Sequence, residues 1–156
     1  MPMTIEASQA TDDPASRPAA PSPQSADGSV GVLEGARVLL VEDEVFIAVD
    51  LQHALEAMGA DVVYARTAVM ASAALREGAF DAAVLDVTLG SRDTCSDIAA
   101  ALLARGTPFV LHSGDLDRQG EIVANIDAPI VPKPAEPDDV VRRLAEAMVE
   151  AGRTRH

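Results

Sequence analysis

The chain of 156 residues contains no tryptophan, one tyrosine, three phenylalanines and one cysteine. Because aromatic residues make up only 3 % of the chain while 48 % is apolar, a core must be built from Val, Leu, Ile and Ala. The single Cys95 excludes an internal disulfide framework and fits a reducing compartment. No apolar run approaches the ~18 residues that span a bilayer, and no secretory signal is visible at the N-terminus. These absences predict a soluble cytoplasmic protein with one folded domain.

Positive charge is also scarce, because 12 Lys and Arg residues stand against 25 Asp and Glu residues, for a net charge of −13. Nucleic acids and anionic membranes are bound through clustered positive charge, so this balance argues against both as partners. Lys133 is the only lysine, and it lies between Pro132 and Pro134 at the end of an apolar run. Either chance placed it there, or the position requires a compact ammonium that the wider guanidinium of arginine does not replace.

The composition changes near residue 35. Residues 1–34 hold five of the ten prolines and show no periodicity of apolar residues, so we expect a disordered tail rich in Pro, Ala and Ser. Residues 35–150 are expected to form the domain, and residues 151–156 a short C-terminal tail. No attached output domain is expected.

Within the domain, short apolar runs alternate with segments of helical spacing. The apolar runs cover residues 37–41, 61–65, 80–85, 108–111 and 129–131. Helix starts or ends between the runs are marked by Gly59, Thr67, Gly78, Gly106 and Pro137. Residues 116–125 are the one segment between runs whose helical pattern is weak, because Gly120 interrupts it. The alternation predicts an α/β fold, a doubly wound five-stranded parallel sheet with helices on both faces.

Charged and polar side chains follow four of the five predicted strands. Glu42 and Asp43 follow the first strand, Asp86 ends the third, Ser113 the fourth and Lys133 the fifth. The carboxyl ends of parallel strands share one edge of the sheet, so these groups are expected to lie together. Two carboxylates ~4 Å apart repel by about 4 kcal/mol at an effective dielectric of 20. Mg²⁺, which prefers oxygen ligands, would relieve that repulsion.

A cation and a lysine beside carboxylates form a pocket for a tetrahedral dianion. One carboxylate is then free to attack phosphorus, which is a known form of covalent catalysis. The metal and Lys133 would neutralise the oxygens of the transferring group, and Ser113 could donate a hydrogen bond to one of them. This chemistry would explain why the position of Lys133 needs a movable point charge.

The segments VLLVEDE, AVLDVTLG, PFVLHSG and PIVPKP resemble the motifs of response regulator receiver domains from two-component signalling. The resemblance covers residues 36–150 and is strongest to the stand-alone alphaproteobacterial receivers with a PFxFATGY motif. It implies a flavodoxin-like fold and a single-domain regulator phosphorylated by a sensor histidine kinase or a phosphotransfer protein. Output to a downstream protein would use a phosphorylation-dependent surface that includes the region after the fourth strand and residues 130–150. Whether phosphorylation also produces a homodimer stays open.

The resemblance also implies roles for the residues at the strand ends. Asp86 would be the phosphoacceptor and undergo only its own phosphorylation and dephosphorylation, so the chain would not be an enzyme with turnover. Mg²⁺ would be bound by Glu42, Asp43, Asp86 and the backbone carbonyl of Thr88.

Two further residues would act on the phosphoryl group itself. Ser113 would be the switch hydroxyl that follows the phosphoryl group, and Lys133 would form a salt bridge with it. The peptide bond between Lys133 and Pro134 is often cis in this family.

Several positions depart from the receiver pattern. Ile130 replaces the Tyr or Phe found three residues before the lysine, and Gly90 replaces a proline in the loop after the phosphoacceptor. Leu111, His112 and Asp115 replace the Phe, Ala and Tyr of PFxFATGY. These departures are compatible with phosphorylation but change the expected output mechanism. Thr88 and Asp115 are expected to affect the lifetime of the phosphate.

Two alternatives use the same residues differently. A phosphate-independent interaction module of the same fold predicts normal partner binding by Asp86→Asn. A phosphohydrolase with an aspartyl nucleophile usually needs a second acid two residues later, where this chain has Thr88. A Ser–His hydrolase is disfavoured because His112 and Ser113, as neighbours in a strand, point to opposite faces.

Overall fold

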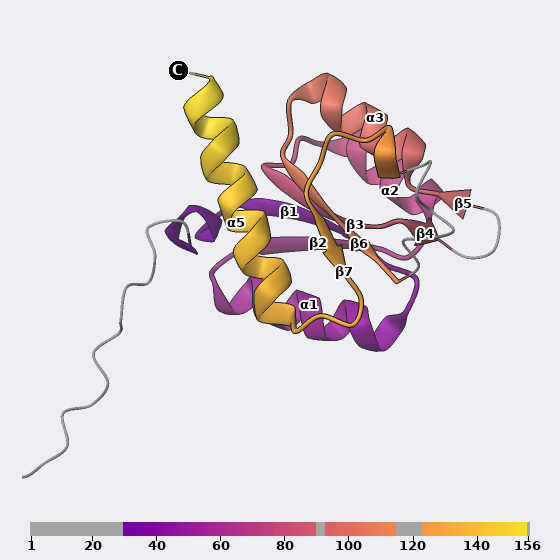
Figure 1. Cartoon of the computed structure of the whole chain (residues 1–156), viewed down its shortest axis with the longest axis horizontal. Coiled ribbons are helices and arrows are strands. Elements are labelled where there is room, and N and C mark those ends of the chain that lie inside the picture. Colours follow the sequence, from indigo (N-terminus) through magenta and orange to yellow (C-terminus); the bar gives the residue numbers. More distant parts are fainter. Residues whose placement is uncertain (1–29, 90–92, 115–122, 156) are drawn as a thin grey trace, which may run out of the picture.

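The computed structural model describes residues 30–89, 93–114 and 123–155. Its centre is a five-stranded parallel sheet in the order β2-β1-β3-β6-β7 (Figure 1). The strands of this sheet are β1 (Arg37–Val41), β2 (Asp61–Ala65), β3 (Ala82–Asp86), β6 (Phe109–Ser113) and β7 (Ile130–Pro132). Each overlaps one of the apolar runs, because a strand covered on both faces needs apolar side chains on both. The predicted doubly wound α/β fold is confirmed.

Helices cover both faces of the sheet. They are α1 (Val45–Ala57), α2 (Ala68–Glu77), α3 (Ser96–Arg105) and α5 (Pro137–Thr154). The predicted cap of α2 is confirmed, because the side chain of Thr67 accepts a hydrogen bond from the backbone N–H of Met70 at 3.2 Å. Gly59 and Gly106 follow α1 and α3 with φ of +84° and +66°, a left-handed conformation that glycine adopts without strain.

The sheet separates two apolar layers, with α1 and α5 on one face and α2 and α3 on the other (Figure 1). Successive residues of a strand point to opposite faces. On β1, Val38 and Leu40 therefore face α1 and α5, whereas Leu39 and Val41 face α2 and α3. By the same alternation, Glu42 continues the row that faces α1 and α5.

The folded part begins earlier than the sequence predicts. A 3-10 helix, η2 (Val30–Leu33), packs against α5, and Leu33 is 0 % exposed in the core. Packed residues therefore precede the predicted boundary after residue 34, because four residues are too few to show a periodicity and tertiary packing buries Leu33. Residues 1–29 of the predicted tail lie outside the described residues.

The folded part also ends later than predicted. α5 continues through Thr154, and the guanidinium of Arg155 donates a hydrogen bond to the carbonyl of Gly106 at the end of α3. The predicted tail of residues 151–156 therefore belongs largely to α5. An antiparallel pair that was not predicted, β4 (Thr88–Leu89) with β5 (Asp93–Thr94), follows β3. Most of the weak helical segment 116–125 lies outside the described residues.

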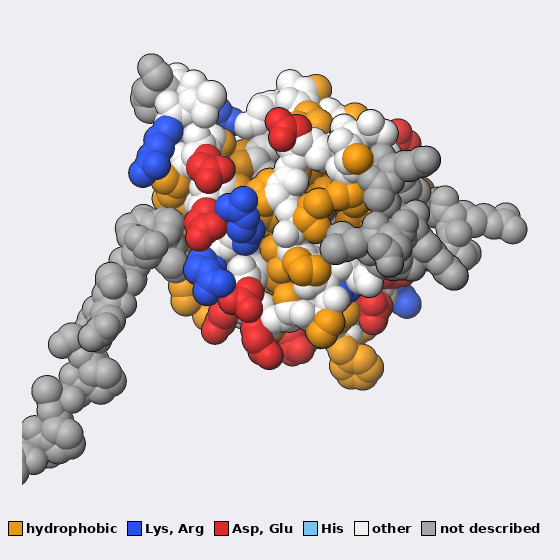
Figure 2. Space-filling model, viewed as in Figure 1, with side chains coloured by type: hydrophobic (Ala, Val, Ile, Leu, Met, Phe, Trp, Pro, Cys, Tyr) orange, Lys and Arg blue, Asp and Glu red, His pale blue; other side chains and the backbone are white. Residues whose placement is uncertain are grey.

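The outer surface of α5 carries charges of both signs (Figure 2). Arg142 pairs with Asp139 at 2.6 Å, and Arg143 pairs with Glu146 at 2.9 Å. Exposed pairs of this kind contribute little stability, so α5 is held mainly by its apolar face. Within the described ranges, every helix is too short or too polar to cross a membrane.

Candidate functional site

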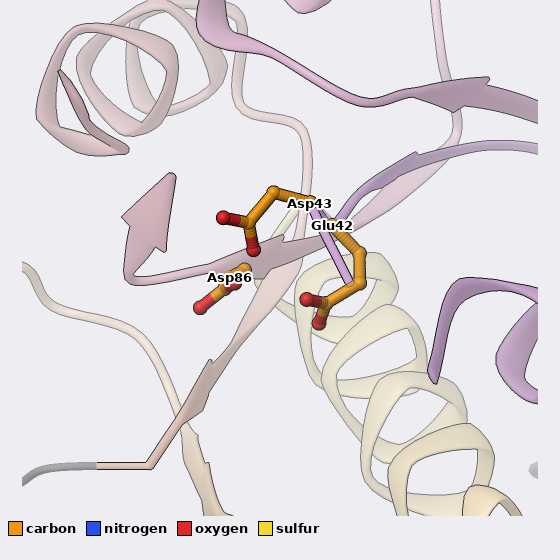
Figure 3. Close-up of side chains that lie close together, drawn as sticks. All are labelled: Glu42, Asp43 and Asp86. Carbon is orange, nitrogen blue, oxygen red and sulfur yellow. The ribbon is translucent and has the colours of Figure 1, made fainter. Parts of the chain in front are cut away.

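The carboxyl edge of the sheet brings together the side chains that follow the predicted strands. Glu42 follows β1, Asp86 ends β3, Ser113 ends β6 and Lys133 follows β7. Figure 3 shows the carboxylates of Glu42, Asp43 and Asp86 gathered where β1 and β3 end. One oxygen atom from each of these three carboxylates lies within 4.8 Å of the other two. An acid cluster able to hold a metal ion is therefore present at the predicted edge.

Two carboxyls of this cluster are buried, since Glu42 is 1 % exposed and Asp86 is 4 % exposed. Burial, together with the charge of Glu42, raises the pKa of Asp86 to about 8. Burial also opposes ionisation of Glu42, but contacts with His112 and Asp86 and the charge of Lys133 outweigh it and lower the pKa of Glu42 to about 2. In the metal-free protein the pair therefore keeps one proton at neutral pH.

The ammonium of Lys133 lies among three carboxylates. Its Nζ atom is 3.4 Å and 3.2 Å from Oε1 and Oε2 of Glu42, and 3.5 Å from Oδ2 of Asp86. Oε1 of Glu44 also lies 3.5 Å from this nitrogen. Burial alone would lower the pKa of Lys133, but the charges of Asp86 and Glu42 raise it, so the side chain stays cationic. One compact ammonium thus forms ion pairs with three carboxylates at once.

The remaining predicted residues border this cluster. Ser113 is buried, and its backbone carbonyl accepts a hydrogen bond of 2.7 Å from the backbone N–H of Lys133. The backbone N–H of Thr88 donates to Oδ1 of Asp86 at 3.1 Å. The peptide bond between Lys133 and Pro134 is cis, as the resemblance implied. The parts that Ser113 and Thr88 take in any chemistry remain predictions.

Two residues that the sequence did not assign to the site contact Glu42. His112 is 2 % exposed on β6, in register with Asp86, and its Nδ1 atom lies 3.8 Å from Oε2 of Glu42. The hydroxyl of Tyr64 on β2 donates a hydrogen bond of 2.8 Å to the backbone carbonyl of Glu42. The strand period correctly separated His112 from Ser113, but only the strand order shows that His112 shares a face with Glu42.

No family model matches the chain, and no curated protein matches it. Solved structures match well. A CheY-like response regulator receiver domain protein from Methanospirillum hungatei aligns with a TM-score of 0.69 at 23 % identity, over 78 % of this chain and 99 % of that chain. The chain has the receiver fold.

The same receiver fold forms part of longer neighbours. The response regulator PhyR from Brucella abortus aligns with a TM-score of 0.69 at 23 % identity, over 82 % of this chain and 54 % of that chain. NtrX from Brucella abortus aligns with a TM-score of 0.68 at 24 % identity, over 78 % of this chain and 28 % of that chain. The chain thus spans about half the length of PhyR and less than a third of NtrX. At these identities the likeness establishes the fold.

A separate groove of about 730 Å³ lies at the opposite edge of the receiver fold. Leu103 of α3, Phe109 of β6 and Ala147 of α5 contribute to its lining. Phe109 is the first residue of β6, whereas Asp86 is the last residue of the parallel strand β3. The groove and the acid cluster therefore lie at opposite edges of the sheet. The acid cluster is the part of the described receiver fold that combines buried acids with a cation.

Proposed function

We propose that the chain is a response regulator receiver that accepts a phosphoryl group on Asp86 from a sensor histidine kinase or a phosphotransfer protein. The observation that carries the proposal is the ammonium of Lys133, which lies between Asp86 and Glu42 at the carboxyl edge of a receiver fold. Phosphorylation would change a surface that includes β7 and α5, and a downstream protein would recognise it. A cytoplasmic location and the PFxFATGY type belong to the same proposal.

Each group near Asp86 has a part in the transfer. The Asp86 carboxylate attacks the phosphorus of a phosphohistidine, so an O–P bond forms as the N–P bond breaks and the imidazole leaves with the electron pair. The backbone N–H of Thr88, 3.1 Å from Oδ1, orients the attacking carboxylate. Lys133 has three N–H donors on a flexible stem and follows one phosphoryl oxygen, while the hydroxyl of Ser113 donates to another.

The acid cluster fits Mg²⁺. Glu42, Asp43 and Asp86 offer carboxylate oxygens, the ligands that this ion prefers. The raised pKa of Asp86 reflects more negative charge than the buried pair tolerates alone, and a cation relieves that excess. With the backbone carbonyl of Thr88, these residues would hold the ion. When bound, it neutralises the carboxylates and the oxygens of the transferring group.

Intact-mass measurement after incubation with acetyl phosphate tests the proposal. With Mg²⁺ present we expect one added phosphoryl group that is labile in base, and none when Mg²⁺ is removed by EDTA. Asp86→Asn should take up none, because the nucleophilic carboxylate is absent. Lys133→Arg should react about tenfold more slowly or not at all, because the guanidinium fork does not follow the phosphoryl group as a point charge does.

The outcomes separate the interpretations. A phosphoryl group that persists in Asp86→Asn would place the acceptor elsewhere. No phosphoryl group on the wild-type chain, from acetyl phosphate or from a purified kinase, would favour the phosphate-independent module, in which Asp86→Asn binds its partner normally. Light scattering of the phosphorylated and unphosphorylated chain determines whether phosphorylation produces a homodimer.

A further inference from the structure

We propose that His112 is a positioning residue. Its imidazole donates a hydrogen bond to the carboxylate of Glu42 when Lys133 turns from that carboxylate to the phosphoryl group. The inference rests on the proposed phosphorylation of Asp86, and it assigns a role to a residue that departs from the receiver pattern. His112 would act as an N–H donor, so the inference depends on its geometry.

Glu42, Asp86 and His112 form one polar row across three neighbouring strands. Asp86 is in register with His112, and Val41 and Leu85, the residues before Glu42 and Asp86, are in register with each other. All three side chains therefore continue the face of the sheet that α1 and α5 cover. On its other side, His112 is in register with the apolar Val131. The polar neighbours of the imidazole within this row are thus the two carboxyls.

The imidazole and Glu42 face each other without a hydrogen bond. Nδ1 of His112 and Oε2 of Glu42 are 3.8 Å apart, longer than a hydrogen bond. Among the described residues, neither ring nitrogen of His112 has a hydrogen-bond partner. Oε2 of Glu42 has no hydrogen-bond partner among them either, although it forms an ion pair with Lys133. Buried polar atoms are normally satisfied, so a buried imidazole in this state is available for a contact that forms in another state.

In the unphosphorylated chain the ammonium of Lys133 pairs with the carboxylate of Glu42, and phosphorylation would draw the ammonium away. Its Nζ atom lies 3.2 Å from Oε2 of Glu42, the same oxygen that His112 faces. A phosphoryl dianion on Asp86 attracts the ammonium more strongly than one carboxylate does. Each N–H donor that turns to a phosphoryl oxygen is lost to Glu42. Glu42 is 1 % exposed, so the oxygen atom that Lys133 leaves then needs another donor, because a buried polar atom without a partner is unfavourable.

His112 is placed to provide that donor. Closing the distance from 3.8 Å to the ~2.9 Å of an N–H···O hydrogen bond takes about 1 Å of movement, within the range of a side-chain adjustment. The exchange keeps Glu42 in place while Lys133 moves. It therefore stabilises the phosphorylated state more than the unphosphorylated state.

The test compares His112→Leu with His112→Asn in the full-length chain. Asn places an amide N–H close to the position of Nδ1, whereas Leu has no donor. His53→Leu, at an exposed histidine of α1, is the matched control. Calorimetric titrations measure the affinity for Mg²⁺ alone, and then for beryllofluoride, a phosphoryl mimic, in the presence of Mg²⁺.

We expect His112→Leu to lose about tenfold more affinity for beryllofluoride than for Mg²⁺, and His112→Asn to recover most of that loss. His53→Leu should match the wild-type chain in both titrations. Equal losses for the two ligands, or a His112→Asn variant as weak as His112→Leu, would overturn the inference and leave the proposed function intact. A wild-type chain that takes neither beryllofluoride nor a phosphoryl group from acetyl phosphate would overturn both.

Discussion

Asp86 and Glu42 are neighbouring buried carboxyls whose pKa values move in opposite directions. The folded protein raises the pKa of Asp86 from 3.8 to about 8, so it holds a proton that the unfolded chain has already released. The stability that this carboxyl contributes is complete below pH 3.8 and is lost as the pH rises to about 8. Glu42 behaves in the opposite way, because its pKa falls from 4.5 to about 2 and its contribution is lost only at acid pH.

This difference predicts how Asp86→Asn changes the metal-free protein. Above about pH 8 the substitution should raise the free energy of unfolding by about 1–3 kcal/mol, because it removes a charge from a buried, crowded site. Below pH 3.8 the gain should almost vanish, since the wild-type carboxyl is then protonated in both the folded and the unfolded chain. Urea unfolding in EDTA at the two pH values measures both. Mg²⁺ should then stabilise the wild-type chain more than Asp86→Asn. An equal gain at both pH values would contradict the assignment.

Residue by residue, the sequence predicted the acids and the lysine but not their neighbours. Glu42, Asp86 and Lys133 each follow their own apolar run, so the rule for parallel strands was sufficient to bring them together. The contact between His112 and Glu42 depends on the order β1-β3-β6 and on strand register. Apolar runs do not encode that order, so neither this contact nor the hydrogen bond from Tyr64 could be derived from them.

At the scale of elements, η2 is the part of the described fold that the sequence missed most clearly. Apolar alternation and caps such as Thr67 identified the strands and helices because both signals are local. A single turn has no periodicity, and its place in the fold comes from contact with α5. Leu33 supplies that contact and is fully buried, although its segment follows a stretch rich in Pro and Ser.

Leu33→Ala should therefore destabilise the domain by about 2–5 kcal/mol, the usual loss for a buried leucine. Val69→Ala is a suitable control, because Val69 is largely exposed and its truncation should change stability by less than about 0.5 kcal/mol. A chain that starts at residue 35 should lose as much stability as Leu33→Ala, whereas one that starts at residue 30 should not. Thermal unfolding of the four variants measures this. If the chain starting at 35 is as stable as the full chain, η2 is not part of the folding unit.

At the scale of the whole molecule, one edge carries both the acid cluster and an exposed apolar surface. Phe46 is 87 % exposed on the first turn of α1, close in sequence to Glu42 and Asp43, and Val45 and Val49 are also exposed there. Figure 2 shows apolar side chains protruding at the edge of the molecule over α1. A phosphodonor protein has to approach this edge to reach Asp86, so this surface would contact it under the proposed function.

Phe46→Ala should slow phosphorylation by a cognate kinase or phosphotransfer protein by about tenfold or more, because exposed aromatic residues often dominate an interface. Phosphorylation by acetyl phosphate should stay unchanged, since a small donor needs no docking surface. Thermal stability should also stay unchanged, because Phe46 is outside the core. Radiolabel transfer and intact mass measure the two reactions. If both donors slow equally, Phe46 acts on the site itself and not on docking.

The hydrogen bond from Tyr64 to the backbone of Glu42 gives this chain an internal optical probe. Tyr64 is the only tyrosine and there is no tryptophan, so the near-ultraviolet emission comes from one phenol, whose oxygen lies 2.8 Å from the carbonyl of an acid-cluster residue. Burial raises the pKa of Tyr64, which keeps the phenol protonated across the physiological range. Ion binding or phosphoryl transfer that shifts Glu42 would alter this emission directly. The natural sequence can thus be followed in real time without a label.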